Sequence, residues 1–418
     1  MNSYPSPVSR EGVVDSLRYM AMYTSSRIES GSEPGQLNEA MAMVGNLPKV
    51  VLHEHLDGGL RPGTVAELAH ECGYADQLPT TDADELGKWF FEAGNSGSLV
   101  KYLSAFAHTC AVMQTAEALT RVAREAVEDL AADNVVYAEL RFAPENHLEQ
   151  GLTMQQVIDA VVEGLAAGEV NAMRAGKDIT ARLLVCAMRQ NDRATEVAQL
   201  TIDNYGSNSD HNYVVGFDIA GPENGFPPSN HAEAFALLRE NLVPFTIHAG
   251  EDAGVDSLRD AVVQGAARLG HGVRIYEDFT ADLEGIVLQD VAKFIRDRQI
   301  PLELCPTSNL QTGVVDNLAD HPFSLLDELG FTCTVNTDNR LLGDTSMSKE
   351  FAVLVTEFGY GYTELFELTA NAINNSFADL PTRERIMSTL IYPPYLELTD
   401  QDGDGEIDAD DALELNLS

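Results

Sequence analysis

Two histidines stand two residues apart in the stretch VLHEHLDGGL, residues 51–60. Side chains at positions i and i+2 of a β-strand point to the same face, so His53 and His55 would project side by side if this stretch forms a strand. Asp57 and two glycines follow directly. Two imidazoles on one face at the end of a strand can hold a metal ion.

Two distant segments carry further ligand types. His248 ends the apolar part of FTIHAGE, and Asp338 lies in VNTDN. A lone histidine on an apolar run is more often a packed core residue, but here several separate occurrences converge. Imidazole and carboxylate both suit zinc, and a position left for water makes such a site catalytic rather than structural. The sequence therefore predicts a mononuclear zinc site with His53, His55, His248 and Asp338 as its ligands.

Two proton-transfer residues accompany these ligands. Glu251 follows His248 by three residues in HAGE, and His271 lies in LGHG. Hydrolysis at a metal needs one group that orients the attacking water and another that donates a proton. One histidine and one glutamate fit these roles, and taken singly either could instead be a structural polar residue.

The elements that must position these residues follow a regular pattern. Eight short apolar runs alternate with segments of helical length, and polar residues stand where each run ends. The runs are KVVLHEH up to residue 55, NVVYAELRF at 134–142, ARLLVCAM at 181–188, VVGFDIAG at 214–221, VPFTIHAGE from 243, ARLGHGVRI from 267, IPLELCPTSN from 300 and FTCTVNTDN from 331. This pattern predicts an α/β fold, a (β/α)8 TIM barrel with its catalytic residues at the C-terminal ends of the strands.

We expect three parts along the 418 residues: a helical N-terminal extension over 1–40, the barrel over 41–395 and an acidic tail over 396–418. The first connection, roughly 60–133, is too long for one crossover helix, and LVKYLSAFAHTCAVM within it has helical apolar spacing. Extra helices here would form a lid over the barrel mouth or pack on the barrel wall.

The tail contains DQDGDGEIDADD, residues 400–411. The pattern resembles an EF-hand or dockerin calcium loop, with Gly405 at its sixth position. The candidate ligands are Asp400, Asp402, Asp404, Glu406 through its carbonyl, Asp408 and Asp411. A single loop with Asp at its twelfth position is equally compatible with a solvated acidic tail.

Composition limits the partners. The formal net charge is −40, which disfavours nucleic acid and anionic membranes. No apolar run approaches the roughly 18 residues of a membrane span, and the first residues lack the pattern of a secretion signal. The five cysteines are scattered and never spaced C-x-x-C, which favours reduced thiols. We therefore expect a cytoplasmic protein.

The segments HEHLDGGLRP, FDIAGPE, HAGED, LGHGVRI, CPTSNLQTG and VNTDN resemble, in order, those of the adenosine deaminase family of metal-dependent hydrolases, over about residues 45–390. The resemblance implies one Zn2+ at the four ligands above, with Glu251 protonating purine N1, His271 managing the attacking water and Asp338 steering it. It also implies that His55 lies beside the substrate and that the backbone N–H of Gly221 contacts purine N3. The partner would be a small purine nucleoside.

Two details refine the resemblance. The family's nucleoside enzymes carry HLDG, as here, and place the acid, Asp57, on a ribose hydroxyl, whereas relatives acting on the free base tend to carry HIEG. Two-metal relatives bridge their metals through a modified lysine on the fourth strand, and VVGFDIAG contains no lysine. Zinc deaminases with a P-C-x-x-C motif are excluded, because no such cysteine pair exists here.

One position departs from the family. Asn339 stands where the family has a second aspartate, whose role is to contact purine N7. N7 accepts hydrogen bonds, and an amide donates at any pH whereas a carboxyl must first be protonated. The expected activity is deamination of adenosine and 2′-deoxyadenosine. Alternatives are deamination of another 6-aminopurine, such as adenine or a modified nucleoside, and a non-catalytic barrel that binds a partner.

Overall fold

The computed structural model describes residues 34–206, 212–282 and 285–399. Eight parallel strands in these ranges form two four-stranded sheets, ordered β1-β2-β3-β4 and β10-β9-β6-β5. They are β1 (Lys49–His55), β2 (Val135–Phe142), β3 (Thr180–Met188), β4 (Val214–Ala220), β5 (Thr246–Ala249), β6 (Arg268–His271), β9 (Leu302–Leu304) and β10 (Cys333–Val335). Each of the eight expected runs contains one of these strands.

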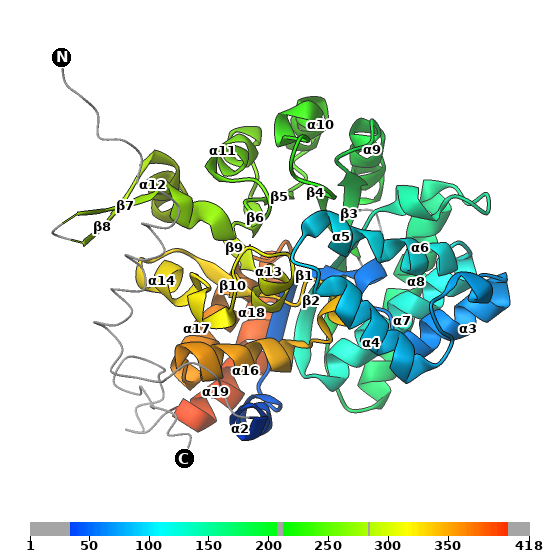
Figure 1. The fold of residues 1–418 in the computed structure, drawn as a ribbon, viewed down its shortest axis with the longest axis horizontal. Helices are drawn as coiled ribbons and strands as arrows, with labels where there is room; N and C mark the ends of the chain where they lie inside the picture. Colours follow the sequence, from blue (N-terminus) through cyan, green and yellow to red (C-terminus); the bar gives the residue numbers. More distant parts are fainter. Residues whose placement is uncertain (1–33, 207–211, 283–284, 400–418) are drawn as a thin grey trace.

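Two isolated bridges join the sheets into a barrel. Glu54 of β1 pairs with Asp338 just after β10, and Phe217 of β4 pairs with Phe245 just before β5. The strands gather at the centre of Figure 1, with the helices around them. The expected (β/α)8 barrel is therefore confirmed.

Helices surround the barrel wall. They are α2 (Pro34–Val44), α3 (Pro62–Cys72), α4 (Ala83–Gly94), α5 (Leu99–Ser104), α6 (Phe106–Val112), α7 (Ala116–Ala132), α8 (Met154–Arg174), α9 (Ala194–Asn204), α10 (Ala232–Glu240), α11 (Val255–Gln264), α12 (Asp290–Asp297), α13 (Pro306–Gln311), α14 (Phe323–Glu328), α15 (Arg340–Gly343), α16 (Met347–Phe358), α17 (Tyr362–Asn374), α18 (Leu380–Ile386) and α19 (Tyr392–Thr399). Among the described residues, no helix is both long enough and apolar enough to cross a membrane.

Local sequence signals explain how the outer helices begin and pack. Thr115 caps α7, and Thr153 forms a capping box with Gln156 at the start of α8. These two helices lie against each other because α8 carries a glycine at the crossing, where a Cβ on Gly164 would lie 2.4 Å from the carbonyl oxygen of Thr120. Close packing of this kind holds the strand ends, and hence the site, in fixed places.

The first connection contains the expected extra helices. Helices α3, α4, α5 and α6 lie between β1 and the crossover helix α7, and they group on one side of the barrel in Figure 1. A short antiparallel hairpin, β7 (Phe279–Asp282) and β8 (Gly285–Leu288), was not expected from the sequence. It lies in the connection between β6 and β9, away from the barrel wall.

The expected end segments are only partly described. Helix α2 runs through the boundary expected at residue 40 and packs against α16. Residues 1–33 lie outside the described residues, and so does the calcium loop expected at 400–411. The division of the chain at residues 40 and 395 therefore stays a prediction.

Candidate active site

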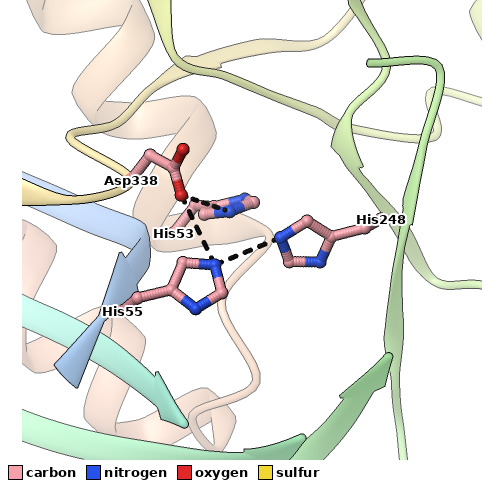
Figure 2. Close-up of side chains that lie close together, drawn as sticks. All are labelled: His53, His55, His248 and Asp338. Carbon is pink, nitrogen blue, oxygen red and sulfur yellow. Dashed lines mark hydrogen bonds and ion pairs between the residues drawn. The ribbon is translucent and has the colours of Figure 1, made fainter. Parts of the chain in front are cut away.

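The four expected metal ligands meet at one end of the barrel. His53 and His55 end β1, His248 lies in β5, and Asp338 follows β10. Their ligand atoms all lie within 4.8 Å of one another. Figure 2 shows the side chains converging: Asp338 Oδ1 is 3.4 Å from Nε2 of both His53 and His55, and His55 Nε2 is 3.2 Å from His248 Nε2.

The orientation of the imidazoles fits a cation at the centre of this cluster. His53 Nδ1 lies 3.0 Å from Glu303 Oε2, and His248 Nδ1 lies 2.9 Å from Asp218 Oδ2. A carboxylate can only accept, so neutral His53 carries its proton on Nδ1 and presents the lone pair of Nε2 to the cluster. Consistent with this, His53 Nε2 is buried and has no hydrogen-bond partner in the described part of the chain. His248 Nδ1 contacts Asp218 as an ion pair and forms no hydrogen bond within the described residues. Three imidazoles and one carboxylate form a donor set that zinc prefers.

One arginine holds the two carboxylates that orient these histidines. Arg141 on β2 places Nη1 2.8 Å from Asp218 Oδ2 and Nη2 2.9 Å from Glu303 Oε2, and Nη2 also donates to the Leu52 carbonyl. All three ionised side chains are fully buried. Burial alone would raise the pKa of Glu303, but Arg141 and then Arg268 hold that pKa well below its usual value. The carboxylates therefore stay ionised and able to accept from the histidines.

Sequence reasoning missed Arg141, Asp218 and Glu303. Each is a charged residue inside an apolar strand run, in YAELRF, GFDIAG and PLELCP. A charged side chain in a buried strand must have a partner of opposite charge. A charged residue within an apolar run was therefore the signal that could have identified these three residues.

Two of the site residues adopt a left-handed backbone conformation. His271 has φ 60° and Asp338 has φ 58°, which is uncommon for residues other than glycine. Such conformations persist where surrounding contacts fix them, and they concentrate at functional sites. For Asp338 one such contact is Ser308, whose hydroxyl donates to Oδ2 at 2.6 Å.

A chain of hydrogen bonds fixes the tautomer of His271. The Phe323 backbone N–H donates to His321 Nδ1 at 3.2 Å, so neutral His321 carries its proton on Nε2, which lies 3.0 Å from Asn309 Oδ1. The Asn309 amide nitrogen then lies 3.1 Å from His271 Nδ1 and donates to it. Burial lowers the pKa of His321 to about 3, and burial followed by His53 lowers that of His271 well below its usual value. Neutral His271 therefore carries its proton on Nε2.

Glu251 faces that nitrogen. Its Oε2 lies 3.6 Å from His271 Nε2, and both residues reach the four-residue cluster through Asp338. Burial, followed by the negative charge of Asp338, raises the pKa of Glu251 well above its usual value. A buried carboxyl with a raised pKa keeps a proton that it can donate.

A second carboxylate holds the turn that carries Glu251. The side chain of Glu223 accepts from the backbone N–H groups of residues 250, 251, 252 and 253, at 2.6 to 3.0 Å, and from the Ser257 hydroxyl at 2.5 Å. Five donors on one buried carboxylate leave the HAGED turn little freedom. Glu223 is a further residue that sequence reasoning missed, although it lies in the quoted IAGPE segment.

The cluster forms the inner end of a cavity of about 360 Å³, a size typical of sites for small molecules. Asp57, Gly221 and Asn339 all border this cavity, together with His55, Glu251 and His271. Gly221 has φ 106°, which any larger residue would adopt only with strain. The structure thus brings the expected substrate-site residues and three of the four expected zinc ligands to one cavity, and the fourth, His53, lies against those three in the cluster.

The two glycines of HLDGG have a steric role beside it. A Cβ on Gly58 would lie 1.8 Å from Asn339 Oδ1, and a Cβ on Gly59 would lie 2.7 Å from Glu54 Oε1. Asn339 can therefore reach the cavity only because residue 58 has no side chain.

Helix α5 and the start of α6 supply an apolar part of the cavity wall. Leu99, Val100, Tyr102, Leu103 and Phe106 border it. The extra helices of the first connection therefore contribute to the site in addition to packing on the barrel wall.

Comparisons with known proteins agree with this arrangement. The family model described as adenosine deaminase matches residues 48–393. An adenosine deaminase of Mycobacterium sp. (strain KMS) is 54% identical over 357 residues, covering 85% of this chain and 97% of the relative. Among solved structures, an adenine deaminase from Arthrobacter aurescens is 25% identical with a TM-score of 0.69, covering 82% of this chain and 97% of that one. The N6-mAMP deaminase of Arabidopsis is 26% identical with a TM-score of 0.70, covering 83% and 98%.

The role of Asp218 in orienting His248 can be tested by the Asp218→Asn substitution. The amide oxygen can still accept, but it lacks the negative charge that Asp218 presents to His248 and Arg141, so metal affinity should fall about 10- to 100-fold, the usual effect of losing such a partner. Competition with a chelator measures this affinity. The matched control is Asp178→Asn, at an exposed acid with only a 4.0 Å ion-pair contact. Equal metal affinity in both variants would contradict the orienting role.

The Glu223→Gln substitution tests whether the HAGED turn positions Glu251. Glutamine keeps one acceptor oxygen but turns an NH2 group toward backbone donors, so the turn should shift. We expect kcat to fall by up to ~100-fold, as small displacements of a catalytic group can cause, with the metal content unchanged. Exposed Glu233 provides the matched Glu→Gln control. A Glu223 variant with the control's kcat would mean that the turn keeps its shape without the carboxylate.

Proposed function

This chain belongs to the adenosine deaminase family, and we propose that its candidate active site works with one zinc ion held by His53, His55, His248 and Asp338. The activity is hydrolytic deamination of adenosine, which yields inosine and ammonia. We extend the proposal to 2′-deoxyadenosine and to a cytoplasmic location. The main support for the zinc site and the mechanism is that four ligand atoms lie within 4.8 Å of one another, next to Glu251 and His271 and beside a cavity.

Zinc, when bound, lowers the pKa of water to about 7 and so would supply a nucleophile at neutral pH. The chain's own residues have to place that nucleophile and move protons. His271, neutral and with its proton on Nε2, orients the water toward C6 of the purine. Asp338, which belongs to the same cluster, would accept a hydrogen bond from that water. Glu251 donates its proton to purine N1, so that negative charge does not build up on the ring.

Three residues of the cavity hold the nucleoside in this proposal. The buried Oδ1 of Asp57 has no hydrogen-bond partner in the described residues and would accept from a ribose hydroxyl. The Gly221 N–H would donate to purine N3. The Asn339 amide would donate to N7, the position that the aspartate of the family contacts. His55 stands beside the substrate as well as in the ligand set.

The alternative substrates are not favoured. Adenine lacks the ribose for which Asp57 is placed, and the high identity over most of the chain is to adenosine deaminases rather than to deaminases of adenine or N6-mAMP. The intact ligand set and both proton-transfer residues also disfavour a non-catalytic barrel. The calcium loop at 400–411 stays a prediction from the sequence.

The central test combines metal content with turnover. Purified protein should contain about one zinc per chain, and chelation should abolish ammonia release from adenosine until zinc is restored. Glu251→Gln should keep the zinc and lower kcat by about 10²-fold or more, because the proton donor is lost. The measurements are elemental analysis and an ammonia assay with adenosine, 2′-deoxyadenosine, adenine and AMP. Two metals per chain, or an unchanged kcat in the Glu251 variant, would overturn the proposed mechanism.

The Asp57→Ala substitution tests the ribose contact. Only the nucleoside has a ribose hydroxyl, so the variant should lose kcat/KM on adenosine by a factor corresponding to about 1.5–3 kcal/mol, the usual worth of a hydrogen bond to a charged group. Turnover of adenine, measured in the same assay, provides the internal control. Equal losses on both substrates would exclude Asp57 from ribose recognition.

The Asn339 contact can be tested with a substrate analogue and with one substitution. In 7-deazaadenosine a carbon replaces N7 and accepts no hydrogen bond, so the amide of Asn339 would be left unpaired. The parent should discriminate against this analogue by about 1–3 kcal/mol in kcat/KM. The Asn339→Asp variant should show a new pH dependence on adenosine, because only a protonated carboxyl can donate. An enzyme that treats both nucleosides alike would place Asn339 outside the purine contact.

A further inference from the structure

A second group of metal-binding side chains lies beside the proposed ribose end of the cavity. Asp57 lies in the short 3-10 helix η1 (Leu56–Gly58), Cys110 in α6, and His147 at the end of the 3-10 helix η3 (Pro144–His147). Their ligand atoms lie within 4.8 Å of one another, and Cys110 Sγ is 4.0 Å from Asp57 Oδ2. This group shares no residue with the four-ligand cluster.

His147 presents a free lone pair to this group. Its Nδ1 lies 3.1 Å from the Met113 carbonyl oxygen, which can only accept, so Nδ1 carries the proton. Burial lowers the pKa of His147 to about 4, so the ring is neutral and Nε2 is unprotonated. This Nε2 is buried and has no hydrogen-bond partner among the described residues. Metal-binding histidines commonly have this arrangement, with one nitrogen donating to a carbonyl and the other free to bind.

The other two side chains of this group, Asp57 and Cys110, are also poorly hydrogen-bonded. Asp57 Oδ1 is also buried and unpartnered within the described ranges, and the thiol of Cys110 is a weak and distant donor. Two buried polar atoms, Asp57 Oδ1 and His147 Nε2, therefore lie in one group without hydrogen bonds from the described residues that would offset the cost of their burial. A cation would satisfy both acceptors at once. Asp57 borders the cavity, so a small ion can reach the group from the barrel mouth.

We propose that Asp57, Cys110 and His147 form a second cation site, which takes a thiophilic divalent ion such as Zn2+ or Cd2+ and thereby competes with the nucleoside for Asp57. Imidazole, thiolate and carboxylate are all zinc ligands. On binding, the sulfur–metal bond forms as the S–H bond breaks, and the proton leaves to solvent. One thiolate and one carboxylate then neutralise the two charges of the ion, which limits the cost of burying it.

The competition with nucleoside rests on the proposed function, whereas the binding of the cation does not. Cation binding is therefore measured first, by a readout that needs no turnover. Zinc-loaded protein is titrated with Cd2+, and the ultraviolet charge-transfer band of a cadmium–thiolate bond is recorded. The four ligands of the main cluster include no sulfur, so exchange of that zinc for cadmium produces no such band. Cys305 lies close to the main cluster, so dependence on Cys110 decides the assignment.

We expect the band in the parent and in Cys72→Ala, the matched control at an exposed cysteine, and its loss in Cys110→Ala. A second variant, His147→Asn, keeps a side-chain donor for the Met113 carbonyl but removes the Nε2 ligand. It should weaken cadmium binding at least ~10-fold, since losing even an indirect metal contact has an effect of that size. A band that persists in Cys110→Ala, or no band in the parent, overturns the site.

The competition is measured on the same proteins with adenosine as substrate. Excess Zn2+, which leaves the identity of the metal in the main cluster unchanged, should raise KM and leave kcat unchanged in the parent and in Cys72→Ala. The inhibition constant should rise at least ~10-fold in Cys110→Ala and His147→Asn. A Cys110-dependent band without inhibition would overturn the competition while the cation site stands. A protein that shows the band but does not deaminate adenosine would instead overturn the proposed function.

Discussion

The contacts of the Arg141 guanidinium are the constraint on which the proposed metal centre depends. This one group touches the carboxylate that orients His248 and the carboxylate that orients His53, and it also donates to the carbonyl of Leu52, next to His53. His53 and His248, which lie on strands at opposite sides of the barrel, are thereby positioned by the same guanidinium group. A planar guanidinium suits this task because its nitrogens are fixed relative to each other, as those of a lysine could not be.

The proton-transfer residues are held by a different means. Glu251 depends on a turn whose backbone N–H groups converge on Glu223, and His271 depends on the amide of Asn309, which His321 in turn orients. Asn309 and neutral His321 add no charge next to the metal ligands, whereas the negative charge of Glu223, after burial and Asp338, contributes to the raised pKa of Glu251. Left-handed backbone at His271 and Asp338 turns these side chains toward the cluster, and the surrounding hydrogen bonds have to offset that strain.

The sequence was sufficient for the barrel and for the residues at its mouth. Apolar runs marked all eight strands, and a polar residue at the end of a buried strand can be recognised because it interrupts the pattern. The hairpin β7–β8 was missed because it is short and lies outside the barrel. Arg141, Asp218 and Glu303 were missed for a different reason: a buried charge reveals that it has a partner, but only the closed barrel shows which partner. The proximity of Cys110 and His147 to Asp57 could not be predicted either, because it depends on how the helices that carry them pack, and the hydrophobic periodicity of a sequence does not determine that packing.

The charges inside the barrel give a physical reason for a divalent ion at its mouth. Three buried carboxylates, Glu139, Glu303 and Asp218, are paired with two guanidiniums, Arg141 and Arg268, which leaves one negative charge in excess. Asp338 adds a second. Burial lowers the pKa values of His55, His248 and His271, whereas the pKa of His53, which burial alone would lower, is raised overall by its contacts with Asp338 and Glu303. Excess negative charge in a buried site is costly. A dication among the four ligands would offset it, so the interior ion-pair layer and the metal centre form one electrostatic unit.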